Sequence, residues 1–180
     1  MKRVGPNKTC PPEMAMTKTT TPFSRRKPLR LSGYDYSGEG AYFVTICTKG
    51  KKCLFGAVQH DQMMLNEAGT IIAKLWSQLP DRFDCVALDS FVLMPNHIHG
   101  IVLLDGGTSL SRVLQEFKSL SSNEYIRGVR AYGWPSFDQM LWQRSFYDHV
   151  IRDDRDMARV RDYISNNPLQ WAMDEENPGT

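Results

Sequence analysis

Two histidines with one residue between them have the clearest potential for metal chemistry in this sequence. His97 and His99 stand at the start of the apolar segment 97–104, and residues two positions apart in a β-strand point to the same face. Both imidazoles would then lie side by side in buried surroundings, where a polar group needs a hydrogen-bond partner or a metal ion. Their spacing leaves two interpretations open, a metal site and a pair of hydrogen-bonded structural histidines.

A tyrosine and an asparagine further along the chain could complete such a site. Tyr163 and Asn167 are four residues apart, and this spacing places them on one face of a helix. The amide oxygen of Asn167 would give a mixed nitrogen and oxygen set compatible with Mn²⁺ or Mg²⁺, although the imidazoles alone would also suit zinc. Tyrosine is a poor nucleophile at neutral pH, so Tyr163 could attack only a phosphate that a metal ion activates. Spacing alone does not favour Tyr163 over Tyr147 or Tyr125.

A sheet and several helices are needed to hold these side chains. Runs rich in β-branched and aromatic residues predict strands at 41–48, 86–94, 97–104 and 141–151. Apolar residues at helical spacing, each run preceded by a capping residue, predict helices at 66–80, 108–128 and 153–168. This order predicts an α+β fold in which helices pack on an antiparallel sheet, with the ferredoxin-like topology as the nearest template.

The length of 180 residues and the ordinary composition, 41% hydrophobic and 23% charged, fit one soluble domain. We expect a disordered leader over 1–23, a domain over 24–170 and a flexible acidic tail over 171–180. No run of about 20 apolar residues and no signal peptide is present, so we expect a cytoplasmic protein without a membrane partner. The four cysteines form no CxxC pair and are expected to be reduced.

Charge is divided unevenly along the chain. The net charge is +2, but the first 31 residues carry eight basic side chains and one acidic side chain. The rest of the chain carries 14 basic and 19 acidic side chains and is therefore negative. Any affinity for nucleic acid would have to come from local basic residues and from the N-terminal arm.

Three segments together resemble a known family. They are 94–102 (MPNHIHGIV), 142–152 (WQRSFYDHVIR) and 162–168 (DYISNNP). They resemble the single-tyrosine HUH transposases, named for a histidine, hydrophobic, histidine motif, and most closely the REP-associated tyrosine transposases. The resemblance covers about residues 24–170. It implies an RRM-like HUH nuclease domain that cuts and rejoins single-stranded DNA, often at hairpins of repetitive extragenic palindromes.

The resemblance also implies a role for each candidate residue. His97 and His99 match the metal-binding histidines of the family, and Asn167 matches the helix ligand. Tyr163 matches the nucleophile, which in the family leaves a 5′-phosphotyrosine and a free 3′-hydroxyl. The metal in such enzymes is usually Mg²⁺ or Mn²⁺, and this implication replaces the zinc option.

Candidates for DNA contacts come from several parts of the chain. They are Arg25, Arg26, Lys118 and Arg144 for phosphates, and Trp142 for stacking on bases. Two of them have simpler explanations, since Trp142 fits a hydrophobic core and Lys118 a solvated helix position. His149 lies in a segment that resembles the family, but physical reasoning assigns it no role.

Two other functions are compatible with the same pattern. The domain could bind single-stranded RNA or DNA without cutting it, although no aromatic RNP-type motif is evident. It could also be a metal-dependent hydrolase that uses activated water, in which case Tyr163 would be dispensable. The joint presence of two histidines, Tyr163 and Asn167 favours catalysis over binding alone. A monomer and a homodimer are both compatible with the sequence.

Overall fold

A four-stranded antiparallel sheet forms the middle layer of the computed structural model, which describes residues 39–179. Its strands are β1 (Gly40–Cys47), β4 (Val86–Leu93), β5 (His97–Leu104) and β6 (Tyr147–Ile151). They lie in the order β4-β5-β1-β6, and every neighbouring pair is antiparallel. The expected leader and the candidates Arg25 and Arg26 lie outside the described residues.

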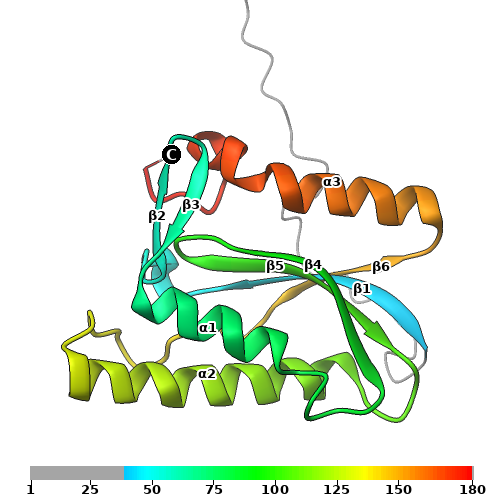
Figure 1. Cartoon of the computed structure of the whole chain (residues 1–180), viewed down its shortest axis with the longest axis horizontal. Helices are drawn as coiled ribbons and strands as arrows, with labels where there is room; N and C mark the ends of the chain where they lie inside the picture. Colours follow the sequence, from blue (N-terminus) through cyan, green and yellow to red (C-terminus); the bar gives the residue numbers. More distant parts are fainter. Residues whose placement is uncertain (1–38, 180) are drawn as a thin grey trace, which may run out of the picture.

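Helices cover both faces of this sheet (Figure 1). Helices α1 (Glu67–Ser77) and α2 (Leu110–Tyr132) lie on one face, and α3 (Asp154–Gln170) crosses the other. Each begins at a predicted capping residue whose side chain accepts a hydrogen bond from a backbone N–H of the first turn. The predicted α+β fold with helices on an antiparallel sheet is thereby confirmed. A short hairpin, β2 (Gly56–Gln59) and β3 (Gln62–Leu65), projects beside α1.

Strand β5 is the centre of the hydrophobic core because both of its faces are covered. Ile98 and Val102 pack into the core on the side of α1 and α2. Ile101 packs with Val160 and Ile164 on the side of α3. Since side chains alternate along a strand, His97 and His99 share the face of Ile101, beneath α3. The sheet therefore places both histidines on the face that α3 covers.

Strand β6 is shorter than the sequence predicted. Residues 141–146 are irregular apart from one bridge between Thr48 and Trp142. The carbonyl oxygens of Gln143, Arg144 and Ser145 accept hydrogen bonds from the Lys118 ammonium group of α2, which is not the backbone pairing that a regular strand requires. The prediction of a strand from residue 141 was therefore wrong.

Helix α3 and the residues after it also differ from expectation. The helix continues through Pro168 to Gln170. Proline is tolerated there because it stands in the last turn, where few backbone hydrogen bonds remain to be lost. The segment expected to be a flexible tail turns back at the 3-10 helix η2 (Trp171–Met173), after which Asp174 and Glu176 are buried.

No helix in the range 39–179 is long and apolar enough to cross a membrane. No disulfide joins the cysteines of this range.

Candidate functional site

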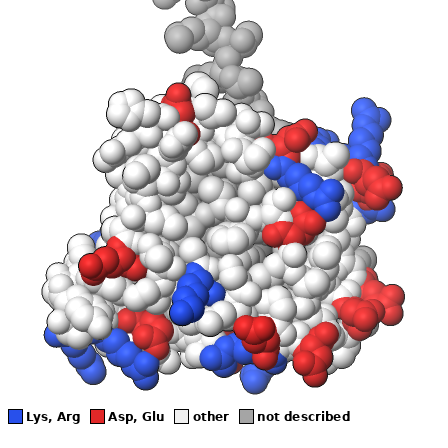
Figure 2. Space-filling view, viewed as in Figure 1, with Lys and Arg blue, Asp and Glu red and all other residues white. Residues whose placement is uncertain are grey.

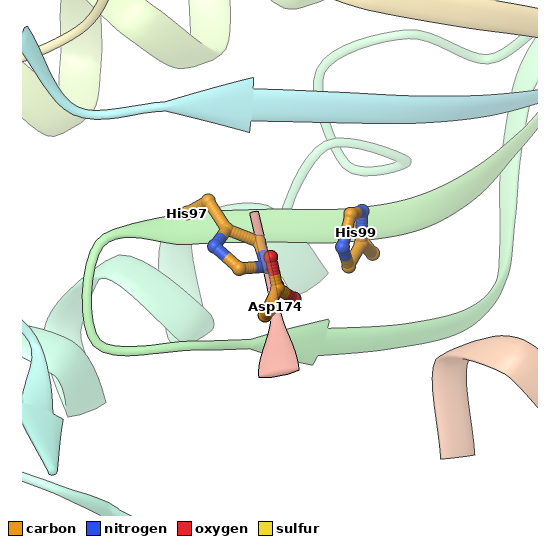
Figure 3. Close-up of side chains that lie close together, drawn as sticks. All are labelled: His97, His99 and Asp174. Carbon is orange, nitrogen blue, oxygen red and sulfur yellow. The ribbon is translucent and has the colours of Figure 1, made fainter. Parts of the chain in front are cut away.

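His97 and His99 are held side by side at the start of β5. They pair with Cys47 and Thr45 of β1 in the antiparallel register. Both are buried, and their ring centroids are 4.5 Å apart. Figure 3 shows the two rings on the same side of the strand, with Asp174 next to them.

Each imidazole is oriented through its Nδ1 atom. The Nδ1 of His97 donates to the Asn96 side-chain oxygen at 2.9 Å, because a carboxamide oxygen can only accept. The Nδ1 of His99 is hydrogen-bonded to the Thr45 hydroxyl at 2.8 Å. Such bonds fix the ring of a metal-binding histidine and leave its Nε2 atom for the ion. These roles of Asn96 and Thr45 could not be predicted from the sequence. The Thr45 contact depends on the pairing of β1 with β5, and the Asn96 contact depends on the orientation of the neighbouring His97 ring.

Burial keeps His99 neutral. The pKa of His99 lies well below its ordinary value because the ring is desolvated and, secondly, because His97 is close. A neutral imidazole is the form that binds a metal ion. The protonation state therefore suits coordination over the whole physiological pH range.

Tyr163 approaches the histidines from α3. Its hydroxyl oxygen is 3.4 Å from His99 Nε2, and its ring packs edge-on against Phe43 at 5.8 Å between centroids. The pKa of Tyr163 is raised, chiefly by burial and then by nearby carboxylates, of which Asp174 is the first. The phenol is thus protonated at neutral pH and needs a positive charge nearby to act as a nucleophile.

Asn167 and Asp174 complete the group. The Asn167 side chain hydrogen-bonds both Tyr163 and Asp174. Its Oδ1 atom is buried and has no hydrogen-bond partner among residues 39–179, which is costly unless a cation fills the position. Asp174 Oδ2 lies 4.0 Å from His97 Nε2.

The donor set fits a divalent cation. One ligand atom from each of His97, His99 and Asp174 lies within 4.8 Å of the others, and the orphaned oxygen of Asn167 is available beside them. Two nitrogens and two oxygens match the preferences of Mn²⁺ and, with more water ligands, of Mg²⁺. Asp174 was missed in the sequence, because no periodic pattern connects an acidic segment after a helix with a distant strand.

The candidates for DNA contacts are placed differently. Lys118 directs its ammonium group to three backbone carbonyls, those of Gln143, Arg144 and Ser145. Burial lowers the pKa of Lys118 to about 8. Its three donors are thereby engaged within the protein, so its role is to hold the irregular segment before β6.

Trp142 and Arg144 follow in that segment. Trp142 is 3% exposed, and its indole N–H donates to the hydroxyl of Ser121 at 2.8 Å. It is a core residue and offers no surface on which a base could stack. Arg144 is exposed and stays a candidate for a phosphate contact.

Comparisons with known proteins agree with the motifs. A family profile described as "Transposase IS200 like" matches residues 41–167. A Haemophilus influenzae protein of uncharacterised function is 35% identical over 174 residues, which cover 88% of this chain and 97% of that protein. A second protein of the same organism, named as a candidate REP-associated tyrosine transposase, is 25% identical over 151 residues, which cover 81% of this chain and 80% of that protein.

Two solved structures share the fold. A REP-associated tyrosine transposase bound to a REP hairpin has a TM-score of 0.55 and 20% identity, covering 79% of this chain and 74% of that chain. A candidate transposase from Deinococcus radiodurans has a TM-score of 0.50 and 16% identity, and the match covers 74% of this chain and 93% of that chain. The profile match extends from β1 to Asn167 and includes both histidines and Tyr163. This chain belongs to the IS200-like transposase family and is similar to its REP-associated tyrosine transposases.

Proposed function

We propose that this protein cuts and rejoins single-stranded DNA through a covalent bond between Tyr163 and a 5′-phosphate. The observation that carries the proposal is the position of the Tyr163 hydroxyl, 3.4 Å from His99 Nε2. Asn167 adds support because it bonds to Tyr163 and keeps an unsatisfied oxygen beside the histidines. A tyrosine with only a packing role would not need such neighbours.

The chemistry is a transesterification. The Tyr163 oxygen forms a bond to phosphorus, and the bond from phosphorus to the 3′-oxygen breaks. The proton lost by the phenol is balanced by the proton gained by the released 3′-hydroxyl. Since one phosphodiester replaces another, the energy of the bond is conserved, and a 3′-hydroxyl can later reverse the step.

His97, His99, Asn167 and Asp174 would hold the cation, which we propose to be Mn²⁺ or Mg²⁺. When bound, such an ion neutralises charge on the phosphate and favours the phenolate. Asn167 would orient the phenol through its amide group, and Asn96 and Thr45 would keep the two imidazoles in place.

The proposed substrate is DNA that folds into a hairpin. The solved relative described as a REP-associated tyrosine transposase is bound to a REP hairpin, and the family match supports the same class of substrate here. A non-catalytic nucleic-acid-binding module and a nuclease that uses activated water are the alternatives.

Incubation with a 3′-labelled hairpin oligonucleotide and Mn²⁺ distinguishes the three functions, because the label stays on the fragment whose 5′-phosphate would be joined to Tyr163. We expect a protein–DNA adduct on a denaturing gel, and none with Tyr163→Phe. Tyr132→Phe is the matched control, because Tyr132 is 71% exposed on α2 and far along the chain from the site. Cleavage by Tyr163→Phe with a free 5′-phosphate would show that water is the nucleophile.

His97→Ala separates cutting from binding in the same assay. We expect it to lose the adduct and retain most DNA affinity, because phosphate contacts outside the metal site dominate binding. Wild-type protein that binds the hairpin and gives neither adduct nor cleavage would support a binding module and contradict the proposal.

A further inference from the structure

Helix α3 carries arginines on the same ridge as the candidate catalytic residues. Arg155, Arg159, Tyr163 and Asn167 are spaced four residues apart within α3, and such residues form one continuous ridge on a helix surface. With a rise of about 1.5 Å per residue, Arg159 lies roughly 6 Å and Arg155 roughly 12 Å before Tyr163 along the axis. The ridge thus connects Tyr163 with exposed arginines in the first turns of the helix.

A pocket of about 500 Å³ opens at this end of α3. It lies between edge strand β6 and the first turns of the helix, and its lining residues are His149, Arg152, Asp153, Arg155, Asp156 and Arg159. Figure 2 shows that charged side chains of both signs gather at the end of the molecule where α3 begins. The pocket is distinct from the metal-ligand cluster, to which it contributes no residue.

The acidic residues of the pocket are engaged in local interactions. Asp156 accepts hydrogen bonds from His149 Nε2 at 2.8 Å and from the Arg159 guanidinium at 2.6 Å. Asp153 caps the helix by accepting from the backbone N–H of Asp156. Both carboxylates therefore already accept hydrogen bonds from donors within the protein.

Two arginines remain available for a ligand. Arg152 and Arg155 are exposed, and within the part of the chain that the structure describes neither forms an ion pair. A planar guanidinium binds phosphate oxygens through two parallel hydrogen bonds. The pocket, lined by three arginines, two aspartates and one histidine, therefore offers an anion with phosphate chemistry two guanidinium groups that form no ion pair among the described residues.

From this arrangement we infer that Arg152 and Arg155, with Arg159 beside them, bind backbone phosphates of the DNA strand next to the bond that Tyr163 cleaves. The inference rests on the proposed function and names a contact site for its substrate. A DNA strand fits better than a lone anion, because a strand with its scissile phosphate at Tyr163 has further phosphates to place along the ridge. Residues 32–180 carry 14 basic and 19 acidic side chains, so affinity for DNA has to come from individual arginine and lysine side chains and from the N-terminal arm.

Single-phosphate neutralisation tests the site. Full-length protein carrying Tyr163→Phe, which prevents cutting, is titrated with hairpin oligonucleotides in which one phosphate at a time is replaced by a neutral methylphosphonate. We expect replacement at one or two positions on one side of the scissile phosphate to weaken binding roughly tenfold, the size of one charge-assisted contact. In the same protein with Arg152→Gln and Arg155→Gln, this weakening should disappear.

The double substitution Arg112→Gln and Arg130→Gln is the matched control, because both arginines are exposed on α2 and their loss changes the net charge equally. It should preserve the methylphosphonate pattern. The inference is overturned if the doubly substituted protein, folded by circular dichroism, keeps the full penalty at every position. The outcome is independent of the adduct assay. If the arginine substitutions remove the methylphosphonate penalty but the protein with Tyr163 intact forms no adduct, only the proposed function is contradicted. If the adduct forms but the penalty is unchanged by the arginine substitutions, only this site is contradicted.

Discussion

The ring of His97 is held from two sides. Its Nδ1 atom bonds to the side chain of Asn96, and its Nε2 atom faces the carboxylate of Asp174 at 4.0 Å. The Asn96 amide group also donates to the backbone carbonyls of Lys51 and Glu176. One asparagine therefore connects the strand that carries the two histidines with the C-terminal segment, and the position of Asp174 depends on that connection.

Substitution of Asp174 by asparagine should weaken metal binding. We expect the Mn²⁺ dissociation constant of Asp174→Asn to rise about tenfold or more, because a negative oxygen is lost beside the two histidines. Isothermal titration calorimetry measures this change directly. Asp162→Asn is the control, since Asp162 is an exposed carboxylate of the same helix region, and it should bind Mn²⁺ as the wild type does. An unchanged constant for Asp174→Asn would remove Asp174 from the ligand set.

At the scale of the elements, Gly100 allows α1 to pack closely on β5. A Cβ atom at this position would lie 2.5 Å from the indole ring of Trp76 and 3.3 Å from Phe91 Cβ. Trp76 is fully buried and cannot move aside easily. The space that Gly100 provides is thus used on the face opposite to the histidines.

Gly100→Ala should destabilise the fold by about 1–3 kcal/mol through overpacking. Chemical denaturation measures the change in the free energy of unfolding. If the clash with Trp76 is the cause, adding Trp76→Phe should cost less in the Gly100→Ala protein than in the wild type. Equal costs in the two backgrounds would show that the two positions are not coupled.

An ion pair fastens α3 to the edge of the sheet. The guanidinium of Arg161 donates two hydrogen bonds, of 2.8 and 2.7 Å, to the carboxylate of Asp89 on β4. The Arg161 hydrogen bond holds the pKa of Asp89 well below its ordinary value of 3.8. Because the folded pKa is the lower one, the stabilising contribution is complete above pH 3.8 and is lost as the pH falls toward the folded value.

Asp89→Asn should therefore lower the melting temperature at pH 7 by roughly 2 °C, the small effect expected of an exposed pair. The difference from the wild type should shrink below pH 3.8, where the Asp89 carboxylate of the unfolded wild-type protein begins to protonate while that of the folded protein stays ionised. Thermal melts at pH 7 and pH 3 measure it, with Asp81→Asn as an exposed control. A difference that is the same at both pH values would contradict an origin in the charge.

Local patterns predicted most of the elements and left the irregular ones undetermined. The caps Asn66, Ser109 and Asp153 and the apolar periods of the helices act within a few residues, so the sequence displays them directly. The segment before β6 is shaped by Lys118 and by burial of Trp142, contacts between parts far apart in the chain. The return of the C-terminal segment to the histidines depends on Asn96 and Lys51, which no local pattern contains.

Across the whole molecule, the catalytic candidates and the cationic pocket lie along one helix. Residues 32–180 are acidic on balance, so general electrostatic attraction of this part of the chain to DNA is weak, and contacts with phosphates would depend on individual arginines such as those that line the pocket at the start of α3. Asn167, which is hydrogen-bonded to Asp174 of the candidate metal-ligand group, is further along the same helix. This arrangement gives a DNA strand one direction in which to lie.

The burial of Asp174 bears on how the protein should be produced for study. A polyhistidine tag fused after Thr180 would be separated from Asp174 by only six residues, and its imidazoles would compete for the same divalent ion. Metal titrations and cleavage assays made with such material would report on the tag as well as on the enzyme. A cleavable tag, removed before measurement, avoids this interference.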